Sequence, residues 1–128
     1  MLSLLPDLLD FGSLAPVILR VALGGTFLGY GLRELIAPKY LPTGAGLPIG
    51  LARIVGAWES LLGSLLILGL FTQIASLLVG LELLGYLFLR LKDKTKIPIP
   101  IDYLLVMLAI AISLMLLGPG LLAIDLPL

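Results

Sequence analysis

The sequence contains no cysteine and no histidine, and these two absences exclude several kinds of chemistry. Without cysteine the chain has no disulfide, no thiol nucleophile and no thiolate ligand for an iron–sulfur cluster. Without histidine it lacks the imidazole base and a common ligand of haem, zinc and copper. We therefore expect neither a metal site nor a redox centre built from the chain's own side chains.

Charge is also scarce, because only 12% of the 128 residues are charged while 60% are hydrophobic. A typical soluble domain has about 25% charged and about 45–50% apolar residues. The eight basic and eight acidic residues cancel, so the chain has no positive field to attract nucleic acid. So few polar groups cannot cover a soluble domain. We expect an integral membrane protein with lipid around it and no nucleic-acid partner.

Four apolar stretches make residues 1–128 a single predicted transmembrane domain. They cover approximately residues 15–37, 49–71, 73–91 and 101–117. Each has roughly the length that a helix needs to cross about 30 Å of hydrocarbon, and backbone amides in lipid must bond within their own segment. Short connections place consecutive helices side by side. The sequence thus predicts an all-α, integral membrane four-helix bundle with antiparallel up-down topology.

The charges that remain are distributed unevenly along the chain. Residues 1–12 contain Asp7 and Asp10 and no basic group, so we expect no cleavable signal peptide. This leucine-rich segment is either a short interfacial helix or a frayed terminus. All basic residues except Arg20 lie in or near the connections 38–48 and 92–100. The positive-inside rule therefore predicts that these two connections are cytoplasmic and that both termini are outside.

Four of those basic residues form a cluster at the end of the third stretch. They could bind anionic lipid headgroups, although their ordinary role is to set the topology. The cluster consists of Arg90, Lys92, Lys94 and Lys96.

Small residues at four-residue spacing predict close packing of the helices, because lipid offers no hydrophobic drive for their association. The longest such series lies in the second stretch. The small residues are Ala52, Gly56, Ser60 and Ser64 in the second stretch, Gly25 and Gly29 in the first, Ser76 and Gly80 in the third, and Ala109 and Ser113 in the fourth.

Ionisable side chains within the predicted spans are the main candidates for a functional site. Such groups are costly in hydrocarbon and usually face the interior of a bundle in pairs. Their depths, at about 1.5 Å per residue, allow Arg20 to meet Glu82, and Arg33 or Arg53 to meet Glu59. We expect at least one of these pairs to form and to hold the helix register. A glutamate without such a partner would be protonated, and it could then carry a proton or bond a quinone carbonyl.

Several motifs follow one another in a set order: LRVALG at 19–24, GYGLREL at 29–35, WESLLG at 58–63, LGLFT at 68–72 and LGPG at 117–120. Their order and spacing resemble the DoxX family of small four-span membrane proteins along nearly the whole chain. The resemblance implies a four-helix bundle and an association with redox chemistry, since one branch of the family is a membrane subunit of thiosulfate:quinone oxidoreductase.

The comparison with that family also implies site residues, and it shows differences. Arg20 and Glu59 match the family's polar helix positions. Tyr30 stands where many members have a histidine, and Gln73 stands where an arginine is usual. Many members keep their termini in the cytoplasm, which is opposite to the orientation that the charges of this chain predict.

Three functions remain open from the sequence. The first is a redox-associated subunit that contacts quinone between helices, with Glu59 or Glu82 bonding a carbonyl, an arginine orienting the ring, and the quinone supplying the redox chemistry. The second is a non-catalytic accessory subunit of a larger membrane complex. The third is a small proton or cation transporter using Glu82. The expected partners are lipid and either further copies of the chain, in a homo-oligomer, or other membrane subunits, and enzymatic activity stays undecided.

Overall fold

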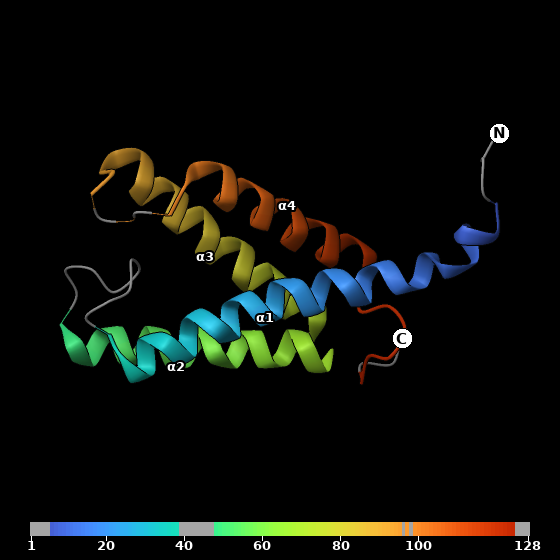
Figure 1. The fold of residues 1–128 in the computed structure, drawn as a ribbon, viewed down its shortest axis with the longest axis horizontal. Coiled ribbons are helices and arrows are strands. Elements are labelled where there is room, and N and C mark those ends of the chain that lie inside the picture. The colour runs from blue at the N-terminus through green and yellow to red at the C-terminus, as the bar shows by residue number, and fades with distance from the viewer. Residues whose placement is uncertain (1–5, 39–47, 96, 98, 125–128) are drawn as a thin grey trace.

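The computed structural model describes residues 6–38, 48–95, 97 and 99–124. A short 3-10 helix, η1, precedes four α-helices that pack as a bundle (Figure 1). The elements are η1 (Pro6–Leu14), α1 (Ala15–Ile36), α2 (Ile49–Leu68), α3 (Thr72–Lys92) and α4 (Ile101–Leu117). The first three α-helices are long and apolar enough to cross a membrane, and α4 is a shorter apolar helix. The predicted all-α bundle is confirmed, and residues 6–12 of the amino-terminal segment are helical rather than frayed.

Proline and glycine determine where several helices begin and end. Pro48 and Pro100 directly precede α2 and α4. A proline has no N–H to donate to a preceding helical turn, so neither helix extends further towards the amino terminus. The predicted second helix was too long at its end, because α2 stops at Leu68. Gly69 follows with φ 69°, a left-handed conformation that glycine adopts without steric cost. The resulting turn is so short that α2 and α3 are antiparallel neighbours.

The bundle consists of two helical hairpins, α1 with α2 and α3 with α4 (Figure 1). Within the first hairpin the two backbones touch at glycines. A Cβ built on Gly24 would lie 2.7 Å from the carbonyl oxygen of Gly63, and one built on Gly31 would lie 2.6 Å from that of Gly56. Each helix thus presents two glycines that are seven residues apart. Because the helices are antiparallel, Gly24 contacts Gly63 and Gly31 contacts Gly56.

The sequence placed the contact face of α1 wrongly. Gly25 and Gly29 face open space, although their four-residue spacing suggested a packing stripe. Gly56 was predicted at the interface and lies there, whereas Gly63 was missed. In α4 the buried small residue is Ala111 rather than Ala109. A four-residue spacing of small side chains therefore predicted close packing, but it did not indicate which side of each helix makes the contact.

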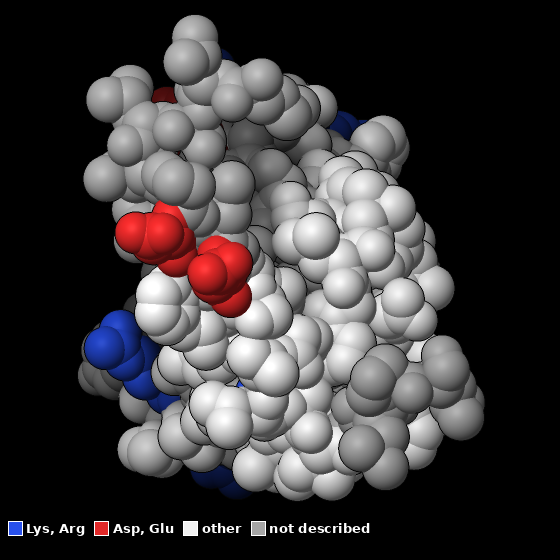
Figure 2. Space-filling model, turned by 90° about the vertical axis from the view of Figure 1, so that its right-hand side faces the viewer, with Lys and Arg blue, Asp and Glu red and all other residues white. Residues whose placement is uncertain are grey.

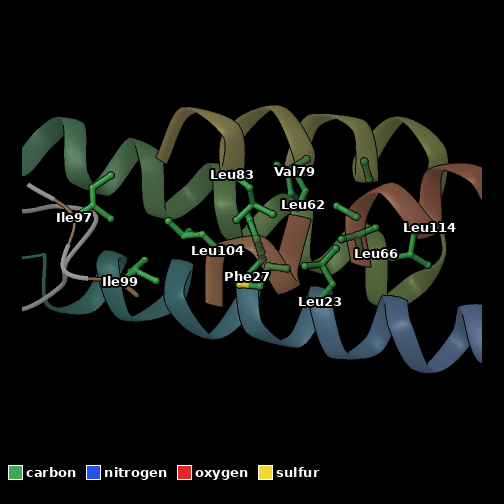
Figure 3. Packing of buried hydrophobic residues seen from close by; sticks show 13 residues of the cluster. Leu23, Phe27, Leu62, Leu66, Val79, Leu83, Ile97, Ile99, Leu104 and Leu114 are labelled. Carbon is green, nitrogen blue, oxygen red and sulfur yellow. The ribbon is translucent and has the colours of Figure 1, made fainter. Parts of the chain in front are cut away.

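A hydrophobic core runs along the length of the bundle between the two hairpins (Figure 3). Its most completely buried members include Leu66, Val79 and Leu114. Ile97 and Ile99, from the connection between α3 and α4, close one end of this core (Figure 3). Large apolar side chains also cover the outer faces of the helices, as expected where hydrocarbon replaces water.

Candidate functional site

A tyrosine hydroxyl joins two glutamates inside the bundle. Tyr86 Oη lies 2.7 Å from Glu59 Oε1 and 2.8 Å from Glu82 Oε1. Glu82 and Tyr86 lie one turn apart on the same side of α3, a spacing that brings their side chains together. Glu59 reaches them from α2 and is only 2% exposed. We call Glu59, Tyr86 and Glu82 the carboxyl–tyrosine triad.

The two short contacts of Tyr86 limit how protons can be arranged in the triad. A phenol has a single O–H to donate, and an ionised carboxylate can only accept. Tyr86 can therefore donate to one of its two carboxyl neighbours but not to both. The other short contact is a hydrogen bond only if that carboxyl donates its own proton to the phenol oxygen. At least one of the two glutamates is thus protonated when both bonds are present.

Glu34 is a third acidic group close to the triad, and the sequence analysis did not single it out. Its side chain is 0% exposed, and neither carboxyl oxygen has a hydrogen-bond partner. Glu34 lies on α1 against Gly56 of α2, and its carboxyl interacts electrostatically with those of Glu59 and Glu82. A signal existed, because Gly24, Phe27, Gly31 and Glu34 share the 3-4-3 spacing of one buried helix face.

Neither of the predicted arginine–glutamate pairs forms. Both glutamates bond Tyr86, while Arg33 and Arg53 are exposed. Arg20 is buried as predicted, but it faces the carboxyl-terminal segment instead of Glu82. The prediction was wrong because depth along a helix axis says nothing about helix rotation, and because the segment after α4 was not expected to fold back onto α1.

The guanidinium of Arg20 ties the carboxyl-terminal segment to the bundle. It donates to the carbonyl oxygens of Pro119 at 3.0 Å, Leu121 at 3.4 Å and Leu122 at 2.6 Å. The same guanidinium lies against Gly69 in the turn between α2 and α3, where a Cβ would collide with it. We call this arrangement the arginine clasp. It joins α1, the turn after α2 and the segment after α4.

Two hollows flank the triad on different sides. A groove of about 500 Å³ between α2 and α3 includes Glu82 and Tyr86 among its lining residues. Its other lining residues are Ile54, Val55, Trp58, Gly85 and Leu89. Several of these are exposed on the outside of the bundle, so the groove is open to its surroundings. The groove is therefore apolar except for an indole N–H, a phenol and a carboxyl group.

The second hollow is a cavity of about 20 Å³ that includes Glu59 and Tyr86 in its lining. This volume has room for about one water molecule. The remaining lining residues are Phe27, Tyr30, Leu83, Ile99, Tyr103, Leu104 and Met107. Tyr86 borders both hollows, whereas Glu82 borders only the groove and Glu59 only the cavity. The triad thus connects the two.

The predicted lipid-binding cluster is only partly available for headgroups. Arg90 donates to the carbonyl oxygens of Lys94 and Ile97, so its guanidinium is occupied in closing the α3–α4 connection. Lys92 and Lys94 are exposed, and Lys96 lies outside the described residues. Binding of lipid headgroups by the two exposed lysines remains a prediction.

Most of the helical bundle matches a known protein family. The DoxX family model matches residues 15–90, from the first residue of α1 almost to the end of α3. The matched region contains Arg20 and the whole triad, and it covers more than half of the 128 residues. Comparisons with curated proteins and with solved structures found no match. The family match and the three helices long and apolar enough to cross a membrane lead to the same conclusion. The chain is a multi-pass membrane protein that belongs to the DoxX family.

Proposed function

We propose that the protein is a quinone-interacting membrane subunit of a redox system, with the quinone ring in the groove between α2 and α3. The observation that carries this proposal is the presence of Glu82, Tyr86 and Trp58 among the lining residues of an otherwise apolar, open groove. A quinone is a lipid-soluble ring with two carbonyl acceptors, so its site needs apolar walls and a few hydrogen-bonding groups. Glu82 would supply such a group, and Tyr86 would hold the Glu82 carboxyl in position.

Glu82 has unused hydrogen-bonding capacity for such a ligand. Its Oε1 faces Tyr86, while its Oε2 is buried and makes no hydrogen bond of ordinary geometry to the described residues, although the Trp58 indole and the Glu59 carboxyl are polar neighbours of the side chain. A buried polar atom without a full hydrogen bond is costly, and a ligand that bonds it after a rotation of the carboxyl group would remove that cost. When protonated, Glu82 would donate to a quinone carbonyl. When ionised, it would accept from the hydroxyl of a quinol.

Trp58 would contribute the flat apolar surface at the rim of the groove. Its side chain is 43% exposed and lines the groove. Aromatic rings stack favourably in offset arrangements, and a quinone head is a planar ring. The arginine that the sequence analysis assigned to orienting the ring is absent from the groove's lining residues, so orientation would fall to Trp58 and Glu82.

Removing the carboxyl group of Glu82 or the hydroxyl group of Tyr86 should weaken quinone binding. We expect Glu82→Met and Tyr86→Phe each to raise the Kd of a short-tailed ubiquinone analogue by about tenfold, because each removes a hydrogen-bonding group while keeping a similar volume. The measurement is a binding titration with the purified protein in lipid nanodiscs. Asp102→Asn is the control, since Asp102 is an exposed acid at the start of α4. Equal affinity in all four proteins would contradict the proposal.

A second function, that of an accessory subunit without a ligand, is favoured by the uncovered glycines of α1. Gly25 and Gly29 lie one turn apart with open space above them, the arrangement at which another helix can approach closely. That helix would belong to another subunit or to a second copy of this chain. The binding titration separates the two functions, because an accessory subunit would bind no quinone.

We also propose that the end of the bundle that carries the exposed basic residues faces the cytoplasm. Arg33, Arg53, Lys92 and Lys94 are exposed near the connections 38–48 and 92–100. The opposite end carries the exposed acidic residues of η1, and Figure 2 shows acidic side chains among mostly uncharged ones on this face, with basic side chains towards its edges. This distribution follows the positive-inside rule.

The absence of cysteine makes this orientation directly testable. A single Asp10→Cys substitution should react with a membrane-impermeant maleimide in intact cells, because η1 would face outward. Lys94→Cys should react only after the cells are permeabilised. The reverse pattern would show that the termini are cytoplasmic. The unsubstituted chain is the control, since it has no thiol to label.

A further inference from the structure

We propose that the carboxyl–tyrosine triad is a proton-transfer site that moves one proton between the groove and the small cavity. The proposal rests on the proposed function only for the source of that proton, which would be a quinol in the groove. Three observations carry it: the two short hydrogen bonds of Tyr86, the positions of the two glutamates on different hollows, and the lack of a basic partner for them among the described residues.

The transfer step needs no change in the charge of Tyr86. A protonated Glu82 gives its proton to the phenol oxygen while the phenol O–H gives its own proton to the Glu59 carboxylate. One O–H bond breaks and one forms at Tyr86, so the tyrosine is neutral before and after. The net result is a proton moved from Glu82 to Glu59 with no electron transferred. Oxygen–oxygen distances of 2.7 and 2.8 Å are ordinary hydrogen-bond lengths for both exchanges.

The two glutamates have the access that such a relay requires. Glu82 lines the open groove, and a rotation of its carboxyl group would bring the buried, unpartnered Oε2 to a proton donor there. Glu59 lines the cavity on the other side, and its Oε2 is also buried and unpartnered. The cavity has room for about one water, which would take the proton from Glu59. Tyr30 and Tyr103 line the same cavity and offer hydroxyl groups for the next step.

Ionisable groups from α1 and α4 face the triad. From α1 the facing ionisable groups are Glu34 and Tyr30, and from α4 the facing group is Tyr103. In the part of the chain that the structure describes, neither glutamate of the triad forms an ion pair with a lysine or arginine. A nearby cation would hold both carboxylates ionised and leave the triad without a proton to exchange. The proposal therefore assigns one shared proton to the two carboxyl groups and Tyr86.

Infrared spectroscopy of the quinone-free protein in nanodiscs tests this inference. Protonated carboxyl groups have a separate C=O stretching band that shifts in D2O. We expect Glu59→Gln to shift the band of Glu82, Glu82→Gln to shift that of Glu59, and Tyr86→Phe to abolish this mutual dependence. Glu34→Gln should remove its own band and leave the dependence in place. Asp102→Asn should alter none of these bands.

Two results would overturn the inference. One is the absence of any protonated carboxyl band that Glu59→Gln or Glu82→Gln alters. The other is a band of one glutamate that responds neither to the other nor to Tyr86→Phe, in variants whose helical circular dichroism matches that of the unsubstituted protein.

The outcome can be separated from that of the proposed function. A triad with mutually dependent bands in a protein that binds no quinone would refute the quinone proposal and leave the proton-transfer site intact. Quinone binding in a protein whose glutamates behave independently would do the opposite.

Discussion

Alanine in place of Gly31 and Gly63 is expected to destabilise the bundle, and each substitution should cost about 1–3 kcal/mol of unfolding free energy. A Cβ on Gly63 would lie 2.5 Å from the backbone nitrogen of Leu28, and one on Gly31 would lie 2.5 Å from that of Ser60. These neighbours are backbone atoms of the opposite helix, so they cannot rotate away. The two helices would have to move apart along their contact.

Unfolding of the purified protein in mild detergent, followed by circular dichroism, measures this effect. The matched control is alanine at Gly25 and Gly29, which lie on the same helix as Gly31 with nothing within 4 Å of a built Cβ. The control should be neutral or slightly stabilising, since alanine is the better helix former by about 1 kcal/mol. If the control variant loses as much stability as the interface variant, α1 and α2 do not touch at the glycines that the structure shows.

Replacing Arg20 by methionine is the second change with a large expected effect. The substitution keeps much of the apolar stem but removes the donors to three backbone carbonyls, those of Pro119, Leu121 and Leu122. Hydrogen bonds to charged groups contribute about 1.5–3 kcal/mol each, and carbonyls left without a partner add a further cost. Solvent reaches part of this region, so we expect a loss of roughly 3 kcal/mol in total.

Limited proteolysis distinguishes this local effect from general unfolding. In the Arg20→Met protein the chain after Gly118 should be cut earlier than the helices, because the arginine clasp no longer holds it. Arg20→Lys should give an intermediate result, since one ammonium cannot reproduce the fork of a guanidinium. A carboxyl-terminal segment that stays protected in Arg20→Met would show that other contacts, such as that of Leu121 N–H with Ser13 O, suffice to hold it.

The triad shows how far reasoning from the sequence reached into the site. Glu59 and Glu82 could be selected because ionisable groups in hydrocarbon rarely occur without a reason. Tyr86 could not, because tyrosine is common near membrane interfaces and a single tyrosine near the end of an apolar stretch does not indicate a site. Its hydroxyl became part of the site because α2 and α3 present Glu59 and Glu82 to it from two helices.

The sequence by itself determined the environment, the helix count and the approximate helix limits. Composition and the length of apolar segments set these properties one segment at a time, so no knowledge of neighbouring helices is needed. The tertiary structure decided which glycines touch, which groups Arg20 binds, and that Glu34 is buried beside the triad. Each of these depends on how the helices are rotated and on where the segment after α4 returns, and neither is a property of one segment alone.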